Sequence, residues 1–278
     1  MKRILNFLFI FVLVLTLSFS LTGCKGDDDK TIIVGTMAQP GEPILESVRE
    51  VLEAKGYTLE IKLFSDFNTP NIALTEGSID VNLFQHEPYL KTYNSSNNTN
   101  LACAAVLYDC VYGGYTKKNI ASVNEIPNGA KITIANDSSN MKRCLLILEA
   151  EGLIELNELP ATLAASDVND YIKTNKKNLV ITPIATNMIA ASLADEDVYL
   201  GLVNATFAIA AGLTSEQLLC KEADPEHINA NILACRPEDL EDQWLKDLVE
   251  ALTADVTSDY ITNQFKGTIV PYFVSRLD

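Results

Sequence analysis

Histidine, tryptophan and basic residues are scarce in this 278-residue chain. It has two histidines, one tryptophan, and 21 Lys and Arg against 37 Asp and Glu. The formal net charge is −16, and it becomes −18 if Lys2 and Arg3 are removed with an N-terminal leader. A body this acidic repels nucleic acid and anionic lipid head groups. We therefore expect no nucleic-acid partner, and we expect the protein to need an anchor of its own to stay at a membrane.

Motifs for metal binding and catalysis are also missing. His86 and His227 lie far apart and belong to no His-x-x-Glu-His type motif, so we expect no metal and no cofactor. No recognisable Ser-His-Asp or Cys-His motif occurs, and His86 beside Glu87 is not enough, because adjacent strand residues point apart. The phosphate-binding motif G-x-x-x-x-G-K-[ST] is absent as well. We predict that the protein is not an enzyme.

Cysteine is present but not in a metal or redox pattern. There are six cysteines and no C-x-x-C pair, which argues against a zinc ribbon or a thioredoxin-like motif. Besides Cys24, an odd number remains: Cys103, Cys110, Cys144, Cys220 and Cys235. The spacing leaves open a Cys103–Cys110 or a Cys220–Cys235 bridge. We favour buried structural thiols, since free cysteine behaves as a small apolar side chain.

The first 30 residues predict a location outside the cytoplasm. Two basic residues are followed by an apolar run over about residues 4–21 and then by Leu-Thr-Gly-Cys, the order of a secretory signal peptide. Residues 21–24 resemble a bacterial lipobox, which implies cleavage after residue 23 and lipidation of Cys24. The alternative is an uncleaved transmembrane anchor, because the run is just long enough to span a bilayer. Residues 24–30 would then form the lipidated cysteine and a flexible spacer.

Strand and helix patterns alternate along the rest of the chain. Short apolar or alternating runs predict strands over residues 32–36, 59–64, 79–84, 101–108, 111–116, 132–135, 179–181, 198–203 and 231–235. Helical spacing predicts helices over residues 44–55, 71–77, 88–93, 142–151, 188–194, 207–211, 239–253 and 258–265. Residues 94–100, NSSNNTN, predict a polar loop. This rhythm indicates an α/β fold with doubly wound sheets, in which ligands bind beyond the carboxyl ends of strands.

Seven residues near those strand ends supply three kinds of functional group: Phe67, Phe84, His86, Tyr89, Arg143, Asn204 and Asn231. The four rings suit an apolar or thioether side chain. The arginine, in the first turn of a predicted helix, suits a carboxylate, and the two asparagine carbonyls suit an ammonium group. Each residue alone also fits a core, capping or solvated surface role. Their predicted co-location favours a receptor for a zwitterionic amino acid.

Three longer motifs resemble one family. The pattern FxDFxxPNxALxxGxIDxNxFQHxPYL covers residues 64–90, NDxxNxxRxLxxLxxxGLI covers residues 136–154, and FKGTIVP closes the series at residues 265–271. Together they resemble the NlpA lipoprotein family of methionine-binding, substrate-binding proteins of ABC transporters. The resemblance spans essentially the whole chain after the spacer.

The resemblance implies a type II periplasmic-binding-protein fold, with two α/β lobes joined by two crossovers. Lobe 1 would comprise residues 31–112 and 236–278, and lobe 2 residues 113–235, with crossings near 112–117 and 235–237. By the same analogy Phe67, Phe84, His86 and Tyr89 form the side-chain pocket. Arg143 would bind the carboxylate, and the asparagines Asn204 and Asn231 would orient the amino acid.

The implied function is an extracytoplasmic, lipid-anchored and monomeric receptor for L-methionine or D-methionine. It would deliver its ligand to a membrane permease driven by a separate ATPase chain. Two alternatives stay open: the same role for another small apolar amino acid or a methionine-containing dipeptide, and a surface adhesin. Several positions depart from the family pattern and leave the ligand open, namely Phe67 in place of Tyr, residues 108–112 without Pro, residues 189–191 in place of Leu-Pro-Arg, and Ala205-Thr206-Phe207 after Asn204.

Overall fold

The computed structural model describes residues 30–277. The predicted signal peptide, the lipidation site at Cys24 and nearly all of the predicted spacer lie outside the described residues. Within residues 30–277, no helix is long and apolar enough to span a bilayer.

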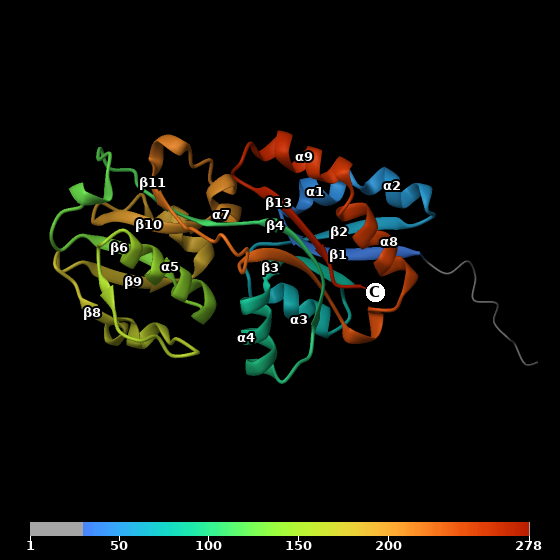
Figure 1. Ribbon diagram of the computed structural model, residues 1–278, viewed down its shortest axis with the longest axis horizontal. Helices are drawn as coiled ribbons and strands as arrows, with labels where there is room; N and C mark the ends of the chain where they lie inside the picture. Colours follow the sequence, from blue (N-terminus) through green and yellow to red (C-terminus); the bar gives the residue numbers. More distant parts are fainter. Residues whose placement is uncertain (1–29, 278) are drawn as a thin grey trace, which may run out of the picture.

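The described chain forms two lobes, each built on its own sheet (Figure 1). The first sheet has the order β13-β4-β12-β3-β1-β2, with β1 (Thr31–Met37), β2 (Thr58–Phe64), β3 (Val81–His86), β4 (Ala102–Asp109), β12 (Ala230–Cys235) and β13 (Val270–Ser275). Strand β1 pairs in parallel with β2 and β3, whereas β12 runs antiparallel to β3 and β4. The predicted α/β class is confirmed, although the sheet is mixed rather than wholly parallel.

Helices cover both faces of the first sheet (Figure 1). One face carries α1 (Gly41–Ser47), α2 (Arg49–Ala54), α8 (Gln243–Leu252) and α9 (Asp255–Phe265), and the other carries α3 (Thr69–Thr75) and α4 (Glu87–Asn97). Apolar side chains from each helix group fill a core against the sheet, such as Leu52 and Leu248 on one face and Leu74 and Leu90 on the other. Because both faces are covered, all six residues of β3 are buried.

The second lobe surrounds a five-stranded sheet of order β11-β5-β10-β6-β9. Its strands are β5 (Tyr112–Tyr115), β6 (Lys131–Ala135), β9 (Val180–Ile184), β10 (Val198–Asn204) and β11 (Leu218–Lys221), and a small hairpin pairs β7 (Glu155–Leu156) with β8 (Ile172–Thr174). Its helices are α5 (Ser138–Ala150), α6 (Ile189–Ser192) and α7 (Ala205–Ala210). The buried residues Met141, Leu145 and Leu148 of α5 pack into the core of this lobe.

Two short segments connect the lobes. Residues 110–111 link β4 to β5, and residues 222–229 link β11 back to β12. The first crossing directly precedes the expected region near 112–117, whereas the second lies well before the expected region near 235–237. The reason is that β12 lies between β3 and β4 in the first sheet, so residues 230–235 belong to lobe 1. A hydrogen bond holds the second crossing beside the start of β5, since the backbone N–H of Glu222 donates to the carbonyl of Tyr112 at 2.9 Å.

Several local elements differ from the sequence prediction. Helix α4 continues through residues 94–97 of the predicted polar loop and ends at Asn98, whose φ of 54° gives the left-handed cap that stops a helix. The predicted helix over 44–55 is broken at Val48 into α1 and α2. Strand β13 was not predicted. It contains Pro271 and pairs only with β4, and a sheet edge is where proline is tolerated.

Candidate functional site

A small cavity lies between the lobes, at the carboxyl ends of several strands. It is lined by Phe67, Phe84, Gln85, His86, Tyr89, Asn140, Asn204 and Asn231. Six of the seven residues predicted for the site are in this set, and Arg143 reaches it through a hydrogen bond to Asn140. The cavity measures about 10 Å³, close to the space that one water molecule occupies. In this conformation the side chains of the two lobes meet across the site.

Aromatic rings form the apolar wall. The ring centroids of Phe67 and Phe84 are 5.7 Å apart, and those of Phe84 and Tyr89 are 5.9 Å apart. The Tyr89 hydroxyl donates to the Phe67 carbonyl at 2.7 Å, which fixes the loop after β2 against α4. From the second lobe, Phe207 brings its ring centroid to 4.9 Å from that of Phe67. Phe207 was not predicted as a site residue, yet it closes this wall.

Buried amides support that wall from beneath. Asn71 donates through Nδ2 to Oε1 of Gln85 at 2.8 Å, and its own Oδ1 accepts from Gln85 and Asn82 at 2.6 and 2.9 Å. All three residues are buried. Satisfied amide networks of this kind fix one arrangement of a core. This network therefore holds the end of β3, and with it Phe84 and His86, in a defined position.

His86 joins the two lobes as a neutral side chain. Its Nδ1 accepts from the backbone N–H of Tyr89 at 3.2 Å, so Nε2 carries the proton and donates to Oδ1 of Asn140 at 3.0 Å. Burial and the positive charge of Arg143 lower the pKa of His86 from 6.5 to about 3. At neutral pH the ring is thus a hydrogen-bonding group and carries no charge.

The start of α5 places Asn140 and Arg143. Asp137 is the N-cap, and its Oδ1 accepts the backbone N–H of Asn140 at 3.0 Å. The second carboxylate oxygen of Asp137 accepts from Nδ2 of Asn140 at 3.0 Å, which turns the amide oxygen toward His86 and Arg143. The Nη1 of Arg143 donates to that oxygen at 3.2 Å. The predicted helix therefore forms, but it begins at Ser138 rather than at residue 142, because Asp137 caps it, so Arg143 lies in its second turn and not in its first.

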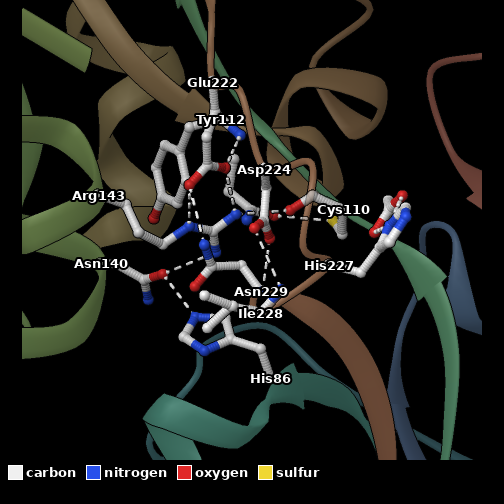
Figure 2. A network of polar contacts seen from close by, with 12 residues as sticks. His86, Cys110, Tyr112, Asn140, Arg143, Glu222, Asp224, His227, Ile228 and Asn229 are labelled. Atoms are coloured by element: carbon white, nitrogen blue, oxygen red, sulfur yellow. Dashed lines mark hydrogen bonds and ion pairs between the residues drawn. The ribbon is translucent and has the colours of Figure 1, made fainter. Parts of the chain in front are cut away.

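Arg143 already holds a carboxylate, that of Glu222 (Figure 2). Its Nε and Nη2 donate to the two oxygens of Glu222 at 2.8 and 2.6 Å, and Nη2 also donates to the carbonyl of Cys110 at 2.9 Å. The side chains are 4% and 8% exposed. Burial disfavours the charge of Arg143, but the bonds to Glu222 outweigh it and raise the pKa of Arg143 above its ordinary value.

Glu222 was missed by the sequence analysis. It begins the crossing that follows β11, in an acidic stretch where nothing in the local pattern separates it from Asp224 or Glu226. Only the topology brings this residue to the cleft. Asn140, by contrast, lies within a motif that the sequence marked, and its position three residues before Arg143 on a helix could have indicated that both share a face.

The two predicted ammonium ligands have other partners as well. Asn204 caps α7, and its Oδ1 accepts the backbone N–H of Thr206 at 3.0 Å and the Cys110 thiol at 3.4 Å. Asn231, which lines the cavity, donates through Nδ2 to the Tyr108 hydroxyl at 3.3 Å. Both side chains are buried beside the cavity. Their role toward an ammonium group stays a prediction.

All five cysteines within residues 30–277 are free, and four of them are buried. Neither the Cys103–Cys110 nor the Cys220–Cys235 bridge forms. Burial raises the pKa of Cys220 and Cys235 to about 12, so these thiols stay protonated. Among the described residues, no group of three or more His, Cys, Asp or Glu side chains is arranged to hold a metal ion.

Comparison with known proteins decides the family. A family model described as NlpA lipoprotein matches residues 32–273. This chain belongs to the NlpA lipoprotein family. The match covers both lobes and both crossings described above, as the sequence motifs predicted.

Relatives of this NlpA lipoprotein cover nearly all of its length. A probable D-methionine-binding lipoprotein MetQ of Vibrio cholerae is 33% identical over 254 residues, which are 90% of this chain and 92% of the relative. The D-methionine-binding lipoprotein MetQ of Escherichia coli strain K12 is 31% identical over 256 residues, 91% of this chain and 93% of the relative. A nutrient-binding protein of Burkholderia cenocepacia, solved bound to methionine, has a TM-score of 0.81 at 32% identity, covering 87% of this chain and 100% of that one.

Proposed function

We propose that this protein captures methionine, as the L- or D-enantiomer, in the cleft between its lobes. The observation that carries the proposal is the cavity itself, where an aromatic wall, a buried arginine and two asparagines from both lobes converge. Rings suit the thioether chain, Arg143 the carboxylate, and the amide oxygens of Asn204 and Asn231 the ammonium group. The methionine named or bound in relatives of similar sequence supports this ligand.

The proposed role is delivery rather than catalysis. Cleavage of the leader and lipidation of Cys24 would tether the body outside the cytoplasm, since acyl chains contribute about 0.8 kcal/mol per buried CH₂. The tethered monomer would hand methionine to an ABC permease whose ATPase is a separate chain. The relatives are named as lipoproteins, and one solved neighbour is titled a periplasmic substrate-binding protein of an ABC transporter, which supports both parts.

A ligand panel on residues 25–278 tests the proposal. The protein is stripped of ligand by partial unfolding and refolded, and its melting temperature is measured with each common amino acid, both methionine enantiomers and glycyl-methionine. A ligand at about 100 times its Kd adds about 2.7 kcal/mol to the free energy of unfolding, which raises the melting temperature clearly. We expect a shift with methionine in wild type and in Asn157→Ala, whose side chain bonds Asp170 within lobe 2, and a much smaller one in Asn231→Ala.

Other outcomes point to other functions. A shift with a different apolar amino acid or with the dipeptide only would keep the receptor and replace the ligand. A protein that responds to none of these compounds would contradict the receptor role and favour a surface adhesin.

A further inference from the structure

Glu222 places a buried carboxylate beside Arg143 in the cleft. Its carboxylate accepts four hydrogen bonds: two from Arg143, one from the backbone N–H of Tyr112 at 3.1 Å and one from Nδ2 of Asn229 at 3.2 Å (Figure 2). These donors come from α5, from the first residue of β5 and from the second crossing between the lobes. All four contacts are donors to the carboxylate, which lies beside the guanidinium of Arg143.

The buried part of the cleft carries no net charge as a result. Arg143 contributes one positive charge and Glu222 one negative charge, while His86 is neutral at physiological pH. The next carboxylate, Asp137, caps the N-terminus of α5, where it accepts the backbone N–H of Asn140 and bonds from the side chains of Ser139, Asn140 and Thr186. The uncharged amides of Asn140, Asn204 and Asn231 complete the polar lining.

Arg143 nevertheless keeps a donor for a ligand. A guanidinium has five N–H groups, and the bonds to Glu222, Cys110 and Asn140 use four of them. One Nη1 N–H has no partner in the described part of the chain, and the other Nη1 N–H bonds Asn140, which lines the cavity. Once the cleft opens enough to admit a ligand, this N–H can bind the ligand carboxylate while Glu222 stays in place.

We propose that Glu222 sets the net-charge selectivity of the cleft. This rests on the proposed function, in which the ligand is an amino acid. Glu222 cancels the charge of Arg143, so the closed site accepts a ligand whose own charges cancel. A carboxylate without an ammonium group would add an unbalanced negative charge to a buried neutral site. An ammonium group without a carboxylate would add an unbalanced positive charge. Burial of either unbalanced charge is strongly unfavourable, whereas a zwitterion adds no net charge to the site.

The test compares three ligands that differ in charge. Methionine is neutral overall, N-acetyl-methionine is an anion, and methioninamide is a cation, and the Kd of each is measured by calorimetry on the ligand-stripped protein. We expect wild type to prefer methionine over both derivatives. In Glu222→Gln the cleft gains one positive charge, so the preference for methionine over N-acetyl-methionine should fall about 10- to 100-fold, while methioninamide should bind even less well.

Two further variants separate charge from structure. Asp224→Asn removes a negative charge from the same crossing, but Asp224 bonds only the backbone N–H groups of Ile228 and Asn229, so the wild-type ratios should remain. Glu222→Asp retains the charge and should also retain the ratios, and it replaces the Gln variant if that variant does not fold. A purely structural role of Glu222 would weaken all three ligands by the same factor.

Each contrary result has a distinct meaning. Unchanged ratios in Glu222→Gln, altered ratios in Glu222→Asp, or a wild type that binds a charged derivative within about threefold of methionine would each overturn the assignment of Glu222. If wild type prefers another amino acid, the derivatives of that amino acid are used. A wild type that binds no free amino acid would overturn the proposed function together with this inference.

Discussion

At the scale of single residues, Arg143 and Glu222 should affect the free energy of unfolding differently when one charge is removed and when both are removed. The pair is nearly fully buried, and breaking such a pair leaves an uncompensated charge in the protein interior. Removing both charges leaves no uncompensated charge in the interior. We expect Arg143→Met and Glu222→Gln each to lower the free energy of unfolding by about 3–5 kcal/mol, and the double variant to lose much less than the sum. Urea denaturation of the four proteins measures this.

An exposed pair supplies the control for that cycle. Arg49 and Glu46 bond at 2.7 Å with side chains 31% and 47% exposed. Exposed pairs contribute little, so the coupling between Arg49→Met and Glu46→Gln should stay below about 1 kcal/mol. Additive losses at Arg143 and Glu222 would show that the guanidinium finds another partner once Glu222 is gone.

His86 predicts a pH dependence of stability. Its pKa is about 3 in the folded protein and 6.5 ordinarily, so below pH 6.5 the unfolded chain binds a proton that the folded protein does not. Stability is therefore complete above pH 6.5 and falls as the pH drops toward 3, by up to about 1.4 kcal/mol per pH unit. His86→Asn, which keeps an acceptor at the N-cap of α4, should flatten the decline between pH 6.5 and 5.

Urea denaturation at several pH values measures that decline. Carboxylates with lowered pKa values, such as Glu46 and Asp247, lose their contribution to the free energy of unfolding mainly below pH 4.5. The change in stability above pH 5 therefore reports on proton uptake by histidine. A variant that declines as steeply as wild type in this window would assign the proton uptake to another group.

At the scale of elements, the start of α5 links helix capping to the site. Asp137 bonds both the backbone N–H and the side chain of Asn140, so it fixes the helix end and the amide that meets His86. We expect Asp137→Ala to lower the free energy of unfolding by about 1 kcal/mol and to weaken ligand binding as well, whereas Asp137→Asn keeps most of the cap. Thermal unfolding and calorimetry measure the two effects.

Helix α8 offers the comparison for that prediction. Asp242 occupies its N-cap position without a capping hydrogen bond, so Asp242→Ala should cause a smaller loss of stability and leave ligand binding unchanged. Equal losses for Asp137→Ala and Asp242→Ala would mean that the hydrogen bonds of Asp137 contribute nothing beyond its charge at a helix start.

The same elements show which parts of the site a sequence can reveal. Phe84 and His86 lie near the end of β3, and Asn204 ends β10. Ligands of α/β proteins bind beyond the carboxyl ends of strands, so sequence reasoning could mark both ends, although β3 and β10 belong to different sheets and only the fold brings them together. Glu222 lies on a crossing whose course depends on how β12 inserts between β3 and β4. That insertion depends on contacts between residues far apart in the chain, and the local hydrophobic periodicity does not predict such contacts.

At the scale of the whole molecule, several contacts between described residues hold the lobes together across the cleft, and three of them lie around the site. His86 bonds Asn140, the ring of Phe67 packs on that of Phe207, and Nδ2 of Asn187 donates to the carbonyl of Ser65 at 3.1 Å. Sites for small molecules typically enclose about 300–1,000 Å³, far more than the roughly 10 Å³ between these lobes. An amino acid must therefore enter through a more open arrangement, and hinge motion about the two crossings supplies one.

The contact between Asn187 and Ser65 allows this opening to be tested. It lies outside the cavity, so Asn187→Ala changes the closed arrangement and leaves the lining intact. The bond is exposed, and losing one hydrogen bond costs about 0.5–1.5 kcal/mol, so we expect ligand dissociation to speed up about 2- to 10-fold, with the radius of gyration of the free protein rising. Stopped-flow fluorescence and small-angle X-ray scattering measure these quantities.

Asn157→Ala is the matched control, because that side chain also donates to a backbone carbonyl, that of Asp170, but within one lobe. It should change neither the dissociation rate nor the radius of gyration. If both variants leave dissociation unchanged, closure depends on the contacts around His86 and Phe207 alone. If both speed it equally, the effect comes from lost local stability, and the hydrogen bond between the lobes has no separate part in retaining the ligand.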